Sequence, residues 1–303
     1  MPTAPPHRAD LIDPSSLASL GKIEIVARWV VDGFLSGLHR SPRKGFSVEF
    51  AEFRPYQPGD DLRYIDWRIV ARADRWMVKQ FEEETNTRAA IVLDVSQSME
   101  WTGSPERLTK LRYAEQVVAA VSLLLLRQRD AVGLVRYDDK LRTVLPARAR
   151  TMQWRRIVRA LTDPGSGSDS RMAEGIQQAA KLIRRPGILI VLSDLLVDPV
   201  EMENAVRVAR AAGHQVTVLH IMDPSEVELD VPGEAIFVDP ESRLEVTATV
   251  ADVREAYAST VVEAIEEWRV RLAAIGAGYE VIRTDAPFGV PLRRAFATRQ
   301  RLP

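Results

Sequence analysis

Short, almost uninterrupted apolar runs alternate with segments of helical periodicity from residue 89 onwards. Runs of this kind are typical of strands buried on both faces, as in the parallel sheets of α/β proteins. The runs that predict strands are 89–95, 131–137, 188–193, 216–221 and 279–283. Apolar positions three and four apart predict helices at 171–184, 200–212 and 251–274. We therefore predict an α/β fold in which a doubly wound, mostly parallel sheet is flanked by helices.

A further helix is predicted after the first apolar run. Ser104 has the side chain of a helix N-cap, and Pro105 suits the first helical position. Apolar residues then follow at helical spacing, at Leu108, Leu111, Val118, Val121 and Leu125. The sequence therefore predicts that this helix begins at Ser104.

The first 84 residues carry a different pattern. Residues 17–38 repeat apolar side chains at helical spacing and predict one amphipathic helix. Residues 46–53 and 76–84 predict two short strands joined by a dense, charged loop. We therefore divide the chain into a flexible N-terminus (1–14), an extension with a helix and strands (15–84) and an α/β domain (85–303).

Composition narrows the range of functions. The 41 basic and 42 acidic side chains leave a formal net charge of −1, so no overall field attracts nucleic acid or anionic lipid. The absence of cysteine excludes disulfides, thiolate metal sites and cysteine nucleophiles, and fits a reducing cytoplasm. Residues 1–14 lack the apolar segment of a secretory signal, and the longest uncharged apolar stretch, 116–126, is shorter than a membrane-spanning helix of about 20 residues. We expect a cytoplasmic protein with no membrane span and no nucleic-acid partner.

Oxygen-bearing side chains follow two predicted strands and end one polar loop that leads into a helix. The carboxyl ends of strands in an open α/β sheet meet in a crevice that binds ligands, and hydroxyl and carboxylate oxygens are the ligands that Mg²⁺ prefers. Taken alone, an Asp-x-Ser-x-Ser pattern would be expected to cap a turn. Three such segments together predict a site for a divalent cation, Mg²⁺ first and Mn²⁺ or Ca²⁺ as alternatives. Its predicted ligands are Asp94, Ser96, Ser98, Ser170 and Asp194.

This set resembles the metal-ion-dependent adhesion site (MIDAS) of von Willebrand factor A domains, in which an Asp-x-Ser-x-Ser motif, a Thr and a later Asp occur in that order. Ser170 stands at the Thr position, since Gly175 and Ile176 follow where that family has a small and an aliphatic residue. Asp169 stands where the family usually has Gly and adds a carboxylate beside the loop. The resemblance implies a von Willebrand factor A-like domain over residues 85–303, whose metal ion docks a carboxylate of a protein partner.

A second resemblance lies upstream, in the sequence EFRPYQPGDDLRYIDW at residues 52–67. It is similar to the signature of the family catalogued as domain of unknown function 58 (DUF58), and the similarity continues through most of the chain after residue 40. Residues 57–60 (QPGD) suit a type II turn, and the charged side chains from Arg54 to Arg72 would pair with one another as a structural clasp. The resemblance implies a non-enzymatic adaptor or chaperone-like partner of a MoxR-type AAA+ ATPase.

Two other functions stay open at this point. A metal-dependent hydrolase would use the same crevice, but the sequence shows no general base or proton donor beside the metal motif. A metal-free scaffold would use Asp94 and Asp194 only to hydrogen-bond neighbouring loops. The chain has no recognised phosphate-binding loop, so we do not expect it to hydrolyse ATP, and we identify no catalytic residues.

Overall fold

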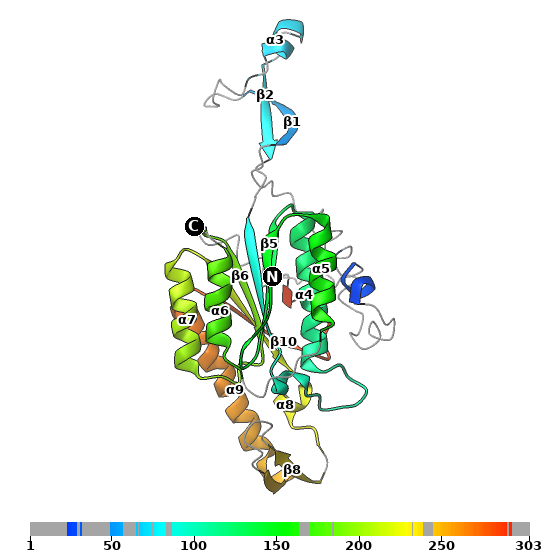
Figure 1. The fold of residues 1–303 in the computed structure, drawn as a ribbon, viewed down its shortest axis with the longest axis vertical. Helices are drawn as coiled ribbons and strands as arrows, with labels where there is room; N and C mark the ends of the chain where they lie inside the picture. Colours follow the sequence, from blue (N-terminus) through cyan, green and yellow to red (C-terminus); the bar gives the residue numbers. More distant parts are fainter. Residues whose placement is uncertain are drawn as a thin grey trace. The chain divides into compact units, whose positions relative to one another are not determined.

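The computed structural model of the 303-residue chain describes residues 23–28, 31, 49–56, 65, 67–73, 76–82, 87–163, 170–183, 185–231, 233–238, 245–289 and 291–292. These residues belong to two compact units (Figure 1). The smaller unit is His39–Asn86, and the larger unit combines Met1–Leu38 with Thr87–Pro303.

The larger unit is built on a six-stranded sheet with the order β10-β7-β6-β3-β4-β5. Its strands run parallel, except that β5 is antiparallel to its neighbour β4. Counted along the chain, this is the order 3-2-1-4-5-6 of doubly wound α/β folds. The strand bounds are β3 (Arg88–Asp94), β4 (Ala131–Tyr137), β5 (Leu141–Arg148), β6 (Ile188–Ser193), β7 (Gln215–Met222) and β10 (Gly278–Arg283).

The five strands predicted from apolar runs are all present, with ends shifted by at most one residue. The sequence pattern did not predict β5. This strand lies at the edge of the sheet, its side chains are partly exposed, and it contains Pro146. An edge strand tolerates Pro and needs no uninterrupted apolar run, so it lacks the signal that marks the central strands.

Helices cover both faces of the sheet (Figure 1). On one face, α4 (Lys110–Arg127) and α5 (Thr151–Leu161) contribute to a buried cluster. On the other face, α6 (Met172–Leu182), α7 (Pro199–Ala211) and α9 (Val250–Ala274) contribute to a second cluster. The predicted class, a doubly wound and mostly parallel sheet flanked by helices, is confirmed.

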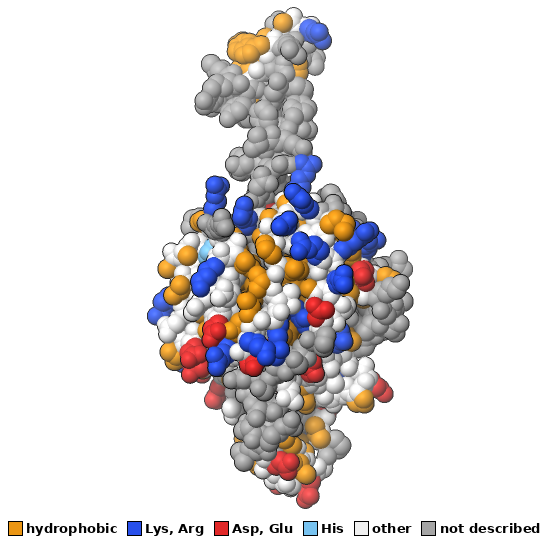
Figure 2. Space-filling view, viewed as in Figure 1, with side chains coloured by type: hydrophobic (Ala, Val, Ile, Leu, Met, Phe, Trp, Pro, Cys, Tyr) orange, Lys and Arg blue, Asp and Glu red, His pale blue; other side chains and the backbone are white. Residues whose placement is uncertain are grey.

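Figure 2 shows that charge is unevenly distributed over one face of the larger unit. Lys and Arg side chains gather on part of this face, although the total formal charge is only −1. Exposed arginines lie at the end of β5, in the residues that follow it and in α5: Arg148, Arg150, Arg155, Arg156 and Arg159. The overall charge therefore does not describe the local surface.

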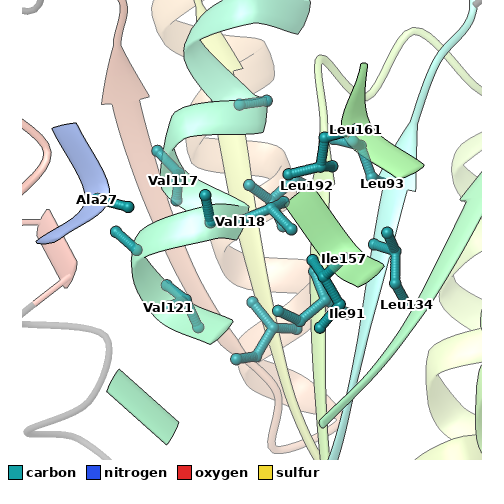
Figure 3. Packing of buried hydrophobic residues seen from close by; sticks show 14 of the residues in the cluster. Ala27, Ile91, Leu93, Val117, Val118, Val121, Leu134, Ile157, Leu161 and Leu192 are labelled. Atoms are coloured by element: carbon teal, nitrogen blue, oxygen red, sulfur yellow. The ribbon is translucent and has the colours of Figure 1, made fainter. Parts of the chain in front are cut away.

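The first buried cluster is shown in Figure 3. Val117, Val118 and Val121 of α4 belong to the same cluster as Ile91 and Leu93 of β3, and these side chains are almost completely buried. Full burial of such a side chain stabilises a fold by about 1.5–3 kcal/mol. This packing holds β3, and therefore the residues that follow it, in the centre of the sheet.

The start of α4 differs from the prediction. Residues 104–107 form turns, and the helix begins after Thr109, which is its N-cap. The Thr109 hydroxyl accepts a hydrogen bond from the backbone N–H of Arg112 at 3.2 Å, whereas the Ser104 hydroxyl accepts one from the backbone N–H of Glu106 at 3.3 Å. A Ser hydroxyl makes such bonds in turns as well as at helix starts, so the Ser-Pro pattern could not distinguish the two.

Other elements of the larger unit were not predicted. They include α5, the short helix α8 (Pro224–Glu228) and a hairpin of β8 (Glu234–Val238) and β9 (Glu245–Thr249). Of the predicted helix at 17–38, residues 23–28 and 31 are described and helical, and Val26, Ala27 and Val31 are buried. In the described part of the chain, no helix is long and apolar enough to cross a membrane.

The smaller unit contains an antiparallel pair of strands, β1 (Glu49–Pro55) and β2 (Met77–Glu82), close to the two predicted strands, and the helix α3 (Trp67–Ala73). The Trp76 ring lies near the rings of Tyr56 and Trp67, with centroids 5.9 and 6.0 Å away. The predicted turn at 57–60 and Asp66 lie outside the described residues, so the clasp stays a prediction.

Candidate metal centre

The strands β3 and β6 run side by side in parallel, with Leu93 opposite Leu192, so the residues that follow them come together. Asp94 ends β3 and is completely buried. Its Oδ2 atom accepts hydrogen bonds from the hydroxyls of Ser193 at 2.7 Å and Ser170 at 2.9 Å. Three segments that are far apart in the sequence thus converge on one carboxylate.

Ser96 and Ser98 complete the first segment. The backbone N–H of Ser96 donates to Oδ1 of Asp94 at 3.0 Å, which folds the chain back just after β3. A short 3-10 helix, Gln97–Glu100, follows, and the hydroxyls of Ser96 and Ser98 lie 3.2 Å apart, within hydrogen-bonding distance. Both serines are buried, so the motif places two hydroxyls beside the Asp94 carboxylate.

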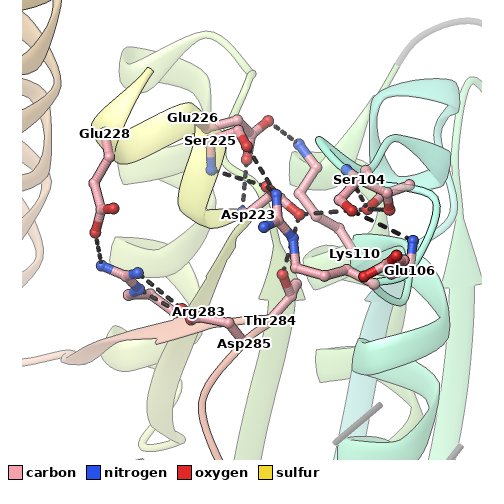
Figure 4. A network of polar contacts seen from close by, with 12 residues as sticks. Ser104, Glu106, Lys110, Asp223, Ser225, Glu226, Glu228, Arg283, Thr284 and Asp285 are labelled. Carbon is pink, nitrogen blue, oxygen red and sulfur yellow. Dashed lines mark hydrogen bonds and ion pairs between the residues drawn. The ribbon is translucent and has the colours of Figure 1, made fainter. Parts of the chain in front are cut away.

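Asp194, the fifth predicted ligand, forms an ion pair with a lysine that the sequence analysis did not single out. Lys110 is the first residue of α4, and its Nζ atom lies 2.8 Å from Oδ2 of Asp194 and 2.5 Å from Oε1 of Glu226. The Lys110 side chain is completely buried, and Figure 4 shows it reaching toward Glu226. The structure therefore places a protein cation within the predicted site.

The electrostatics of the two aspartates differ. Burial, and then the nearby charge of Asp194, raise the pKa of the Asp94 carboxyl to about 6. For Lys110, burial lowers the pKa, but the charges of Asp194 and Glu226 outweigh it and hold the pKa above its usual value. Lys110 is thus an ammonium paired with Asp194 and Glu226, whereas Asp94 makes no ion pair within the described residues.

A second polar network fixes Glu226 (Figure 4). Asp223 is the N-cap of α8: its side chain accepts from the backbone N–H of Ser225 at 2.9 Å, and its own backbone N–H donates to Glu226 at 2.9 Å. Arg107 donates to the Asp223 carboxylate at 2.9 Å and to the Ser225 hydroxyl at 2.8 Å. This capping box holds the Glu226 carboxylate beside Lys110.

Sequence reasoning missed Lys110, Ser193 and Glu226. Ser193 directly precedes Asp194 at the strand end and could have been included on that ground. Glu226 lies three residues after Asp223 with Pro224 between them, which is the pattern of a capping box. Lys110 carried no signal, because a lysine near a helix start is expected to be exposed.

The site residues fit a hard divalent cation. Their hydroxyl and carboxylate oxygens are the donors that Mg²⁺ and Ca²⁺ prefer. Asp94, Asp194 and Glu226 carry two more negative charges than the single ammonium of Lys110 supplies, and a divalent ion would balance them. No group of three or more His, Asp or Glu side chains converges on one point in the described part of the chain, so an ion would depend on the serine hydroxyls as well.

The strand order and the helices on both faces define a doubly wound α/β domain, and polar side chains gather at the carboxyl ends of β3 and β6. The chain matches the family described as protein of unknown function DUF58 over residues 52–267, and it belongs to that family. Its relatives include the uncharacterized proteins Mb1516 of Mycobacterium bovis and Rv1480 of Mycobacterium tuberculosis. Each is 28% identical over 299 residues, which are 97% of this chain and 93% of the relative.

Solved structures also resemble the chain. An aerotolerance-related membrane protein from Bacteroides fragilis is 17% identical, with a TM-score of 0.49 over 71% of this chain and 100% of that chain. The conserved hypothetical protein BatB from Bacteroides thetaiotaomicron is 17% identical, with a TM-score of 0.46 over 71% and 98%. The SpRpn10 VWA domain is 10% identical, with a TM-score of 0.43 over 69% and 94%.

Proposed function

We propose that this chain is a non-enzymatic protein-interaction module whose crevice binds a divalent cation, and that a carboxylate of the partner completes the coordination of the ion. One observation carries the proposal: the completely buried Asp94 carboxylate accepts hydrogen bonds from three segments and has no ion pair in the described part of the chain. A buried charge is unfavourable unless it is paired or coordinates a metal. The crevice therefore has the charge and the donor atoms that a cation requires.

The proposed ligands are Asp94, Ser96, Ser98 and Ser170, with Asp194 acting directly or through water. We propose Mg²⁺ first, because it retains several water molecules and needs few charged ligands, while Mn²⁺ or Ca²⁺ would use the same oxygens. Bound there, the ion would act as a Lewis acid and accept an oxygen of an outside carboxylate as a ligand. Because Mg²⁺ retains several water molecules, an outside carboxylate could replace one of them and complete the coordination.

For the partner we propose a MoxR-type AAA+ ATPase, with this chain as its adaptor or chaperone-like companion. Support comes from the similarity of residues 52–67 to the DUF58 signature and from membership of that family. ATP hydrolysis would belong to the partner, since the sequence has no recognised phosphate-binding loop.

Calorimetric titration with Mg²⁺ and Mn²⁺ tests the proposal on the wild type and on Asp94→Asn, which keeps the shape of the side chain and removes its charge. We expect one ion to bind to the wild type and none to the variant. At a hundred times the dissociation constant, the ion should raise the free energy of unfolding by about 2.7 kcal/mol. A pull-down with an AAA+ ATPase should then succeed in Mg²⁺ and fail in chelator.

Each alternative predicts a different result. If millimolar Mg²⁺ and Mn²⁺ leave the wild-type melting temperature unchanged, metal binding is contradicted and a metal-free scaffold is supported. Turnover of ester or phosphoester substrates that requires the metal and Asp94 would instead support a hydrolase.

A further inference from the structure

Lys110 occupies a position that disfavours a cation. It is the first residue of α4, where the backbone N–H groups give the helix a partial positive charge. Its side chain is also completely buried, and a buried ammonium is strongly unfavourable unless carboxylates compensate it. Lys110 therefore depends on the groups that surround its Nζ atom.

Those groups come from three segments. Asp194 follows β6, Glu226 belongs to α8, and the Trp101 ring lies with its centroid 5.8 Å from Nζ. The two carboxylates are not held equally. Glu226 is fixed by a 2.9 Å hydrogen bond from the backbone N–H of Asp223. Apart from its pair with Lys110, the Asp194 carboxylate accepts, among the described residues, a long hydrogen bond of 3.4 Å from the backbone N–H of Leu196. Asp194 is therefore the carboxylate with the weaker backbone hydrogen bond.

We propose that Lys110 competes with the metal ion for Asp194 and thereby sets the metal affinity of the crevice; this inference rests on the proposed function. While the ion pair is closed, Asp194 is withheld from the ion, and the ammonium repels an approaching cation. When an ion binds, Asp194 turns from Lys110 toward it, and Glu226 retains the ammonium. Lys110 thus keeps metal binding weak and reversible, while Glu226 prevents a stranded buried charge.

The first test is Lys110→Met, which keeps the length of the side chain and removes its charge. Titration with Mg²⁺ should show binding about tenfold tighter than in the wild type, a difference of about 1.4 kcal/mol. In chelator the variant should melt at a lower temperature than the wild type, because two carboxylates lose their counter-charge, and Mg²⁺ should restore more of this stability than it adds to the wild type. Lys181→Met is the matched control: this exposed lysine lies in the last turn of α6, and its loss should leave the affinity unchanged.

The second test is Glu226→Gln, which removes the other partner of the ammonium. Lys110 should then hold Asp194 more firmly, and the Mg²⁺ affinity should fall several-fold. Both variants lose a buried ion pair and both should be less stable in chelator. A purely structural role for Lys110 would therefore not move the two affinities in opposite directions.

The outcomes separate this inference from the proposed function. The competition would be overturned, while the metal site stands, by either of two results. One is a Mg²⁺ affinity that Lys110→Met leaves unchanged or weakens, and the other is an affinity that Glu226→Gln leaves unchanged or tightens. If neither the wild type nor any variant binds Mg²⁺ or Mn²⁺, both the competition and the proposed metal site are contradicted. Binding by Lys110→Met alone would support the competition and show that the wild-type crevice works without metal. If Lys110→Met does not fold, the direction of the change in Glu226→Gln decides.

Discussion

At the scale of single residues, the burial of Asp94 bears on stability as well as on the proposed metal binding. Its pKa of about 6 in the folded chain compares with 3.8 for an unperturbed aspartate, mainly because of burial. The folded state then binds a proton more tightly than the unfolded state. The contribution of Asp94 to stability is therefore fully present below about pH 3.8 and is lost as the pH rises through about 6.

We predict that Asp94→Asn is more stable than the wild type in chelator at pH 7.5, by about 1–3 kcal/mol, since each pKa unit corresponds to about 1.4 kcal/mol. The amide can still accept from the Ser96 N–H, and the serine hydroxyls can reverse their hydrogen bonds. Urea unfolding from pH 4 to pH 7.5 measures the effect. A variant less stable than the wild type in chelator would show that the hydrogen bonds of the carboxylate outweigh its desolvation.

His220 gives a pH dependence of the opposite sign. It is buried, its Nδ1 atom lies 2.7 Å from the Tyr279 hydroxyl, and burial lowers its pKa from 6.5 to about 4. The unfolded chain then binds the proton more readily, so stability is fully present above pH 6.5 and is lost as the pH falls toward 4. We predict that His220→Gln removes an acid-side loss of roughly 2 kcal/mol, measured as the change in unfolding free energy between pH 4.5 and pH 7. Parallel pH profiles for the variant and the wild type would contradict this.

The sequence could predict Asp94, Ser96 and Ser98 as neighbours because they are joined by the chain and follow a strand that must be buried. Ser170 could be added because it ends a polar loop that leads into a helix, and because it stands at the Thr position of the metal site that the motif resembles. The partner of Asp194 could not be found in the same way. Lys110 lies 84 residues before Asp194, and only the packing of α4 on the sheet brings their side chains together.

At the scale of elements, the start of α4 tests which hydroxyl acts as a helix cap. Thr109→Ala removes the acceptor for the Arg112 N–H and should lower the free energy of unfolding by about 1 kcal/mol. Ser104→Ala, which removes a hydroxyl from the preceding turn, is the matched control and should have a smaller effect. Denaturant unfolding of both variants measures the difference. A larger loss in Ser104→Ala would favour the helix start that the sequence pattern predicted.

Elements were predictable where burial dictates composition. The central strands are buried on both faces, so nearly every residue in them must be apolar. The edge strand β5 and the helix α5 are freer, because β5 needs only partial burial and α5 presents several exposed arginines. The hairpin of β8 and β9 exposes Ile236, Val238 and Val246. Apolar residues in its sequence therefore could not be used to predict a buried strand.

At the scale of the whole molecule, the candidate metal centre draws residues from both layers of helices. The α4 layer supplies Lys110, and the segment before α6 on the opposite layer supplies Ser170. Asp94 ends β3 of the sheet between them, and Asp194 directly follows β6. Single substitutions at Asp194 therefore have two effects, because they remove a proposed ligand and leave Lys110 with Glu226 alone. A test of coupling between metal and partner should use Asp94, which has no ion pair among the described residues.

We predict that metal and partner binding are coupled through this crevice and that the coupling is reciprocal. If Mg²⁺ tightens binding of the AAA+ partner by some factor, the partner must tighten binding of Mg²⁺ by the same factor. The measurement is a set of four titrations on the wild type: metal with and without partner, and partner with and without metal. In Asp94→Asn both factors should fall to one, while any metal-independent affinity for the partner remains. Equal partner affinity in Mg²⁺ and in chelator for the wild type would exclude a metal-bridged interface and would place the interaction surface elsewhere on the domain.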